Sequence, residues 1–143
     1  MTNANPYLQS LDEEVLSADP IHLVLLLLRG ARQSTEQARR ALNNEQVRER
    51  ALAISRAIER IGELCRNLDY ERGGEIARRL AALYDYLIYR LNEANMHQTE
   101  APLAEVSALL VPLIEVWSEM EIARLPDAAA TGSDSHLAAN LCA

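Results

Sequence analysis

The amino-acid sequence predicts an all-α protein, an antiparallel up-and-down four-helix bundle with a short N-terminal helical segment and a flexible C-terminal tail. The chain has 143 residues, 49% of them apolar, which suffices for one domain with its own core. It has only five glycines and five prolines, and alanine, leucine, arginine and glutamate dominate, which favours helices. Apolar residues recur at alternating spacings of four and three, as in the seam of a left-handed bundle.

Residues 1–18 are predicted to be a docking segment that precedes the bundle. Tyr7, Leu8, Leu11 and Val15 would share one stripe of a helix. Because so short a helix is not stable alone, we expect it to dock on the rest of the chain.

The bundle is predicted to occupy residues 19–125. Asp19 and Pro20 form a helix start, with an acidic N-cap followed by proline, and the first helix is expected over residues 20–42. Asn43 and Asn44 interrupt the pattern, and a second helix follows over residues 45–68. Its predicted core seam is Val47, Ala51, Ile54, Ile58, Ile61, Cys65 and Leu68.

The third helix is expected over residues 75–94, after a chain reversal at the adjacent glycines Gly73 and Gly74. Its predicted seam is Ile76, Leu80, Leu83, Leu87, Leu91 and Ala94. Pro102 opens the fourth helix, whose seam is Leu103, Val106, Leu110, Leu113, Trp117 and Met120. Residues 126–143 are rich in Ala, Ser, Gly and Asp, a composition typical of a disordered tail.

The charge pattern argues against a nucleic-acid partner. The net charge is −7, and all fourteen basic residues are arginines scattered among acids. We expect local helix pairs such as Glu36 with Arg40 and Glu75 with Arg79. The N-terminus lacks the features of a signal peptide, and the apolar run over residues 21–28 is far shorter than a membrane span. We therefore expect a cytoplasmic protein without stable membrane insertion.

Residues that could carry chemistry do not form a catalytic or metal-binding pattern. A dinuclear metal site in a bundle requires Glu-x-x-His pairs, whereas Glu93 and His97 have the wrong spacing and the three histidines are scattered. Cys65 and Cys142 are interpreted as free thiols. Gly73 and Gly74 lack the spacing of a phosphate-binding loop. The sequence predicts a binding protein and no enzyme, with no cofactor and no metal ion.

The first long helix carries more apolar residues than one core-facing stripe requires. Ile21 and the run over residues 23–28 surround its axis for about two turns. Either this helix is the most central one, or part of its surface receives another helix. Tyr84, Tyr86 and Tyr89 around Asp85 are a second candidate surface, since tyrosine suits half-wet interfaces.

Several segments resemble the flagellar export chaperones of the FliS type. These are residues 68–77 (LDYERGGEIA), Leu80, 83–86 (LYDY) and 90–95 (RLNEAN). Further likeness lies at Tyr7, Val15, residues 17–20, 23–24 and 30–31 in the N-terminal half, and over residues 105–117 in the last helix. The likeness covers about residues 6 to 120. The sequence departs from the family at Asp19, where a serine is usual, and at Leu28 and Arg29, where an aromatic residue and an acid are usual.

The resemblance implies a four-helix bundle that binds the disordered C-terminal segment of flagellin, prevents its premature polymerisation and assists type III flagellar secretion. It implies a monomer or weak dimer, with export-gate and other flagellar proteins as further candidate partners. The alternative is a self-associating helical-bundle adaptor with no flagellin cargo. The candidate cargo contacts are Tyr7, Leu8, Leu11 and Val15 as the groove cover, Leu23, Leu26 and Leu27 as its wall, and Tyr84, Tyr86 and Asn95.

Overall fold

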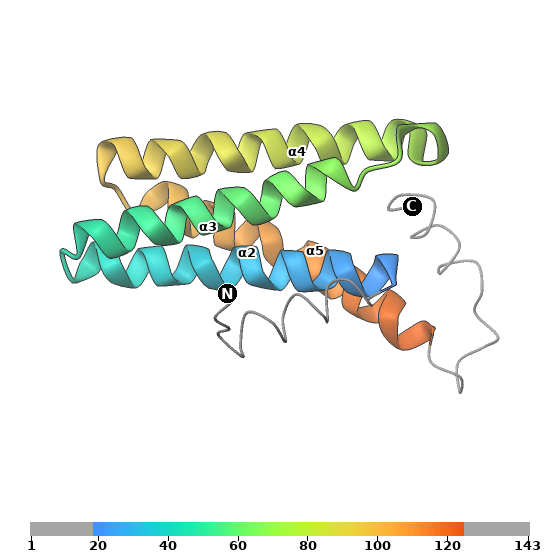
Figure 1. Cartoon of the computed structure of the whole chain (residues 1–143), viewed down its shortest axis with the longest axis horizontal. Helices are drawn as coiled ribbons and strands as arrows, with labels where there is room; N and C mark the ends of the chain where they lie inside the picture. Colours follow the sequence, from blue (N-terminus) through green and yellow to red (C-terminus); the bar gives the residue numbers. More distant parts are fainter. Residues whose placement is uncertain (1–18, 125–143) are drawn as a thin grey trace, which may run out of the picture.

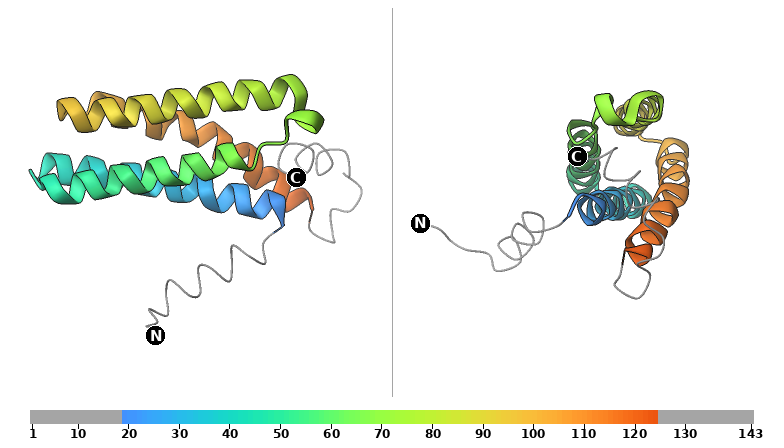
Figure 2. Two further views of the ribbon diagram at one scale, coloured as in Figure 1. Left: turned by 45° about the horizontal axis from the view of Figure 1, so that its top comes forward. Right: turned by 90° about the vertical axis from the view of Figure 1, so that its right-hand side faces the viewer.

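A computed structural model describes residues 19–124, which form four helices: α2 (Pro20–Asn43), α3 (Val47–Arg66), α4 (Tyr70–His97) and α5 (Ala101–Ala123). Successive helices run in opposite directions (Figure 1). α2 packs against α3 and α5, and α4 closes the ring by packing against the same two helices (Figure 2). The predicted all-α, up-and-down bundle is confirmed. The predicted docking segment and tail lie outside the described residues.

The start of α2 is fixed by the predicted cap. Asp19 has an extended backbone, and its Oδ1 accepts a hydrogen bond from the backbone N–H of His22 at 2.9 Å. Arg124, just after α5, also donates to Asp19 Oδ1 at 2.5 Å, and the imidazole of His22 contacts Glu121. Burial raises the pKa of Asp19, but the hydrogen bonds from His22 and Arg124 outweigh it and hold that pKa below its usual value. These contacts join the two helix ends.

α3 is rotated relative to the predicted seam. Val47 is 58% exposed, so its predicted core position is wrong, whereas Ile54 and Ile61 are buried as expected. The remaining buried residues of α3 are Arg50, Ala53, Ala57 and Leu64. Of these, Ala53 and Ala57 are small and allow α3 to pack closely on α2, where a Cβ added to Gly30 would lie 2.5 Å from Arg60 Nε. Tight packing on α2 therefore sets which face of α3 is buried.

α4 begins earlier than predicted, at Tyr70, because Asp69 caps it by accepting from the backbone N–H groups of Glu71 and Arg72 at 3.0 and 3.1 Å. Residues 70–73 form a single turn that is separated from the rest of α4 at the predicted glycine pair. Gly74 has φ 52° and ψ −124°, so the helix breaks there and its straight part starts where the sequence predicted (Figure 1). The helix ends at His97, followed by Gln98 in the left-handed region.

Alanine substitution at the two glycines is expected to have opposite effects. Gly74→Ala should destabilise the chain by about 1–2 kcal/mol, because its positive φ strains an L-residue while nothing within 4 Å contacts the new Cβ. Gly73→Ala is the matched control, and we expect it to be neutral or stabilising because Gly73 is helical. Chemical denaturation of both variants measures the difference. Equal destabilisation by the two variants would contradict a specific need for glycine at position 74.

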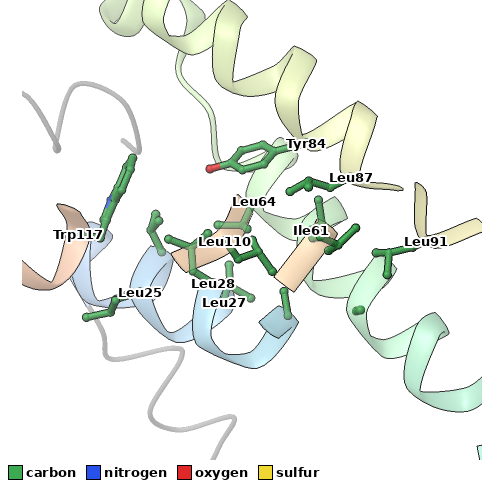
Figure 3. Packing of buried hydrophobic residues seen from close by; sticks show 14 of the residues in the cluster. Leu25, Leu27, Leu28, Ile61, Leu64, Tyr84, Leu87, Leu91, Leu110 and Trp117 are labelled. Atoms are coloured by element: carbon green, nitrogen blue, oxygen red, sulfur yellow. The ribbon is translucent and has the colours of Figure 1, made fainter. Parts of the chain in front are cut away.

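α5 supplies the fourth wall of the core. Leu103, Val106, Leu110, Trp117 and Met120 are buried as predicted, and Leu113 is partly buried. Figure 3 shows Leu110 and Trp117 near buried residues of the other three helices. By length and composition α5 could cross a bilayer, but here it packs on α2 and α4 as a bundle helix.

The two ion pairs predicted from helical spacing have different outcomes. Glu36 pairs with Arg39, at 3.0 Å, and not with Arg40 as predicted. Glu75 does pair with Arg79, at 3.4 Å.

Candidate functional site

α4 and α5 meet at one end and diverge toward the other (Figures 1 and 2). Where they meet, Glu105 of α5 accepts hydrogen bonds from the hydroxyl of Tyr86 at 2.8 Å and from Arg90 Nε at 2.5 Å. Arg90 also donates to Glu93 at 2.6 Å. These polar contacts tie the C-terminal half of α4 to the start of α5, and beyond them the helices separate.

Apolar side chains line the separating part on both helices. On α5, Leu109, Pro112 and Val116 follow Glu105 at helical spacing and share its side of the helix. Leu109 is partly buried, Pro112 is exposed and Val116 is 47% exposed. Their exposure thus increases away from the contact with α4.

On α4, exposure also increases along the aliphatic residues toward the N-terminus, while Tyr86 at the contact with α5 is 41% exposed. Tyr86 contacts α5, Leu83 and Leu80 are partly buried, and Ile76 is 47% exposed. We call the set formed by Ile76, Leu80, Leu83, Leu109, Leu113 and Val116 the α4–α5 surface. Because exposed apolar surface is unfavourable in water, apolar side chains left partly or largely exposed on these two helices indicate a candidate interaction site.

Two aromatic residues, one from each of these helices, belong to the core. Trp117 of α5 is 4% exposed, and Tyr84 of α4 is 1% exposed. Figure 3 shows Tyr84 beside Leu87 in the middle of the cluster and Trp117 at its edge. The Nε1–H of Trp117 is buried, and none of the described residues accepts a hydrogen bond from it.

The polar contact between α4 and α5 holds its carboxylates in the charged form. The hydrogen bond from Arg90 lowers the pKa of Glu105 below its usual value, and Tyr86 adds to the effect. Hydrogen bonds to carboxylates raise the pKa of Tyr86, through Glu105, and of Tyr89, through Glu93. Near neutral pH the cluster therefore keeps charged carboxylates and protonated phenols.

The stability of this junction is expected to depend on pH. Because the folded-state pKa of Glu105 is lowered, its stabilising contribution is present above the unfolded-state value of about 4.3 and is lost as the pH falls through the folded value. Between about pH 6 and about pH 3, Glu105→Gln should lose less stability than the parent chain. Glu115→Gln on the exposed side of α5 is the control. Urea midpoints at both pH values measure the effect. An equal change of the urea midpoint between the two pH values for the parent chain and for Glu105→Gln would contradict it.

The predicted cargo contacts on the first long helix are mostly covered. Leu27 is buried, Leu23 is partly buried against the core, and Leu26 is partly exposed. α3 and α5 flank this helix, so much of its extra apolar surface is internal.

The other predicted contacts are dispersed. Tyr84 belongs to the core in this structure, Tyr86 is exposed beside the α4–α5 surface, and Asn95 is exposed near the opposite end of α4. Tyr7, Leu8, Leu11 and Val15 lie outside the described residues. Most residues of the α4–α5 surface were predicted to lie in core seams. Helical spacing alone carries no signal that α4 and α5 diverge and leave these residues partly uncovered.

Polar hollows flank α2 on its two sides. A cavity of about 400 Å³ between α2 and α5 is lined by Arg29, Arg32, Gln33, Glu36 and Ile114. A cavity of about 460 Å³ between α2 and α3 has nine lining residues, among them Arg40, Leu52 and Arg56. Within residues 19–124, no group of three or more His, Cys, Asp or Glu side chains is placed to hold a metal ion. Cys65 is half-buried, and burial raises the pKa of its thiol.

Sequence comparison relates the chain to proteins of flagellar export. The family model described as "Flagellar protein FliS" matches residues 3–124. The chain is 44% identical over 108 residues to flagellar secretion chaperone FliSB of Pseudomonas aeruginosa, covering 76% of this chain and 86% of the relative. It is 38% identical over 112 residues to flagellar secretion chaperone FliS of Salmonella typhimurium, covering 78% and 83%. For flagellar secretion chaperone FliS of Bacillus subtilis the identity is 29% over 119 residues, covering 83% and 88%. The chain therefore belongs to the FliS family of flagellar secretion chaperones, proteins that act by binding and not as enzymes.

Proposed function

We propose that this chain binds the C-terminal segment of flagellin in the cytoplasm, prevents its premature polymerisation and holds it for export through the flagellar secretion system. The observation that carries this proposal is the α4–α5 surface, an incompletely covered apolar surface in a member of an export-chaperone family. It has the chemistry needed to receive the apolar face of a helix.

The proposed mechanism is coupled folding and binding. An exposed flagellin segment would form an amphipathic helix and lay its apolar face on Ile76, Leu83 and Val116. Each square ångström of apolar area removed from water contributes about 25 cal/mol. Part of that gain offsets the entropy lost when the segment becomes ordered. The affinity is therefore moderate for the area buried, which suits a cargo that must later be released.

The N-terminal residues are proposed to cover cargo-binding surface when cargo is absent. Tyr7, Leu8, Leu11 and Val15 would supply an apolar stripe resembling that of the cargo, with Leu23, Leu26 and Leu27 beside it. Leu23 and Leu26 are partly exposed on α2, whereas Leu27 is buried. Tyr86 and Asn95 are proposed as further contacts on α4, together with Tyr84, which is buried in the core of the free chain.

Calorimetric titration with a peptide of the flagellin C-terminus, from the same genome as the chain, tests the proposal. We expect a one-to-one complex and a gain in peptide helicity by circular dichroism. A peptide of similar length from the central part of the same flagellin is the control. Absence of binding at micromolar concentration, with the chain folded, would refute the proposal.

The alternative, a self-associating bundle without flagellin cargo, predicts a different result. Sedimentation of the chain alone would then give a tight dimer, and the flagellin peptide would not dissociate it. Under the proposal, the chain is a monomer or weak dimer that forms a complex with the peptide.

A further inference from the structure

The charges of this protein are divided unequally between the two sides of the bundle. α2 and α3 together carry nine arginines and four glutamates, a net charge of +5, whereas α5 carries four glutamates and no arginine. α4 is neutral, with four arginines and four acids. Because the whole chain has a net charge of −7, α2 and α3 form a basic side on an acidic protein. Such a local reversal of charge attracts partners of opposite charge.

Three arginines on this side have no carboxylate partner. Arg40, Arg56 and Arg60 form no ion pair within residues 19–124. Helical spacing offers Glu36 to Arg40, but Glu36 pairs with Arg39. By contrast, each of the four arginines of α4 pairs with a carboxylate. The basic side therefore carries guanidinium groups whose charge the described part of the chain leaves uncompensated.

Two of these arginines line the same hollow. The cavity of about 460 Å³ between α2 and α3, which we call the α2–α3 hollow, has Arg40 on its α2 wall and Arg56 on its α3 wall. Leu52 lies one turn before Arg56 on the same wall and is 45% exposed. Arg60 follows Arg56 by one further turn, and its side chain lies beside Gly30 of α2. The hollow thus combines unpaired cations with an exposed apolar side chain.

The charges around the hollow fit separate carboxylates better than a continuous phosphate surface. Guanidinium groups pair with carboxylates through two parallel hydrogen bonds. Glu49 also lines the hollow, and Glu59 is exposed on the same helix, so a nucleic acid or an anionic membrane would bring phosphates against these glutamates. The net charge of −7 would repel such polyanions as well. A protein segment can place carboxylates beside the arginines alone and an apolar side chain on Leu52.

We propose that the α2–α3 hollow binds an acidic segment of a partner protein, in which two carboxylates flank an apolar residue. The carboxylates pair with Arg40 and Arg56, and the apolar side chain packs on Leu52. α2 and α3 lie on the side of the bundle opposite α4 and α5 (Figure 2). The hollow lies near the connection from α2 to α3, whereas the α4–α5 surface is most exposed toward the other end, at Ile76 and Val116 (Figure 1). The partner therefore leaves the α4–α5 surface free for cargo.

A two-dimensional amide NMR titration of the full-length chain with a synthetic helical peptide tests this inference. The peptide carries a leucine with one glutamate a turn before it and another a turn after it, and the control peptide has glutamine in place of both glutamates. We expect weak, saturable binding that shifts the amide signals of residues 37–56 and that weakens as salt is added. Absence of binding at millimolar concentration, equal binding of the control peptide, or shifts confined to other helices would overturn the inference.

Two matched double variants separate the hollow from the effect of net charge. Arg40→Gln with Arg56→Gln removes the proposed contacts, and affinity for the acidic peptide should fall roughly tenfold. Arg78→Gln with Arg79→Gln removes the same charge from exposed positions of α4 and should leave the affinity nearly unchanged. Equal losses in the two double variants would show that the peptide responds to net charge and not to this site.

Competition experiments distinguish the other possible occupants. Vesicles of phosphatidylserine and phosphatidylcholine, or a short DNA duplex, should not displace the acidic peptide at about 0.15 M salt. Displacement by either would overturn the assignment to a protein segment. Saturation with the flagellin C-terminal peptide should leave the acidic peptide bound, and its release would contradict two separate surfaces. Because the titration of the free chain does not involve flagellin, its result stands even if the proposed function fails.

Discussion

Replacement of Ile61 by aspartate is expected to unfold the chain. Ile61 is 0% exposed and lies on α3 within the core cluster, among leucines of the other helices (Figure 3). An aspartate there would place a charge without a cation in an apolar environment and would remove the packing of a large side chain. Together these costs are expected to exceed about 5 kcal/mol, comparable with the whole stability of a domain of this size. Circular dichroism and thermal denaturation measure the loss.

The matched control is Ile122→Asp on α5, because Ile122 is 61% exposed. The same change of side chain at that position should alter stability by less than about 1 kcal/mol. If both variants unfolded to a similar extent, the destabilisation by aspartate would not depend on the burial of the replaced isoleucine. Ile58 is a weaker test position, since it is only partly buried.

Replacement of Val116 by aspartate is expected to weaken cargo binding strongly while leaving the bundle folded. Val116 is 47% exposed, so the free chain can hydrate the new carboxylate. In the complex, the proposed cargo helix would cover this position and bury the charge against apolar side chains. A cost of about 3 kcal/mol corresponds to roughly a hundredfold loss of affinity. Calorimetric titration with the flagellin C-terminal peptide measures the change.

Val47→Asp is the control for this experiment. Val47 is 58% exposed and begins α3, outside the α4–α5 surface. We expect this variant to bind the peptide with the parent affinity. If Val47→Asp weakened binding as much as Val116→Asp did, the cargo would lie elsewhere or the loss would reflect net charge alone. Ile76→Asp, on the opposite side of the surface, should reproduce the effect of Val116→Asp.

Local sequence determined the number, order and start points of the helices. Asp19 with Pro20, and Asp69 as a cap, fix helix starts through hydrogen bonds to amides two or three residues away. Pro102 also favours the start of α5 locally, because proline is preferred in the first turn of a helix. Seam residues such as Leu87, Leu91, Leu103 and Leu110 are buried as their spacing predicts. The residues at the candidate catalytic positions also favoured binding over catalysis, and residues 68–77 indicated the family.

Only the tertiary structure decided which apolar residues remain uncovered. Spacing places Ile76 and Val116 on inward or near-inward faces, but it carries no information on the distance between two helix axes. α4 and α5 meet at Glu105 and separate beyond it, so residues with the same periodicity are buried at one end and exposed at the other. Likewise, contacts with α3 and α5 cover most of the leucine-rich face of α2. Periodicity is a property of one helix, whereas exposure depends on how neighbouring helices pack around it.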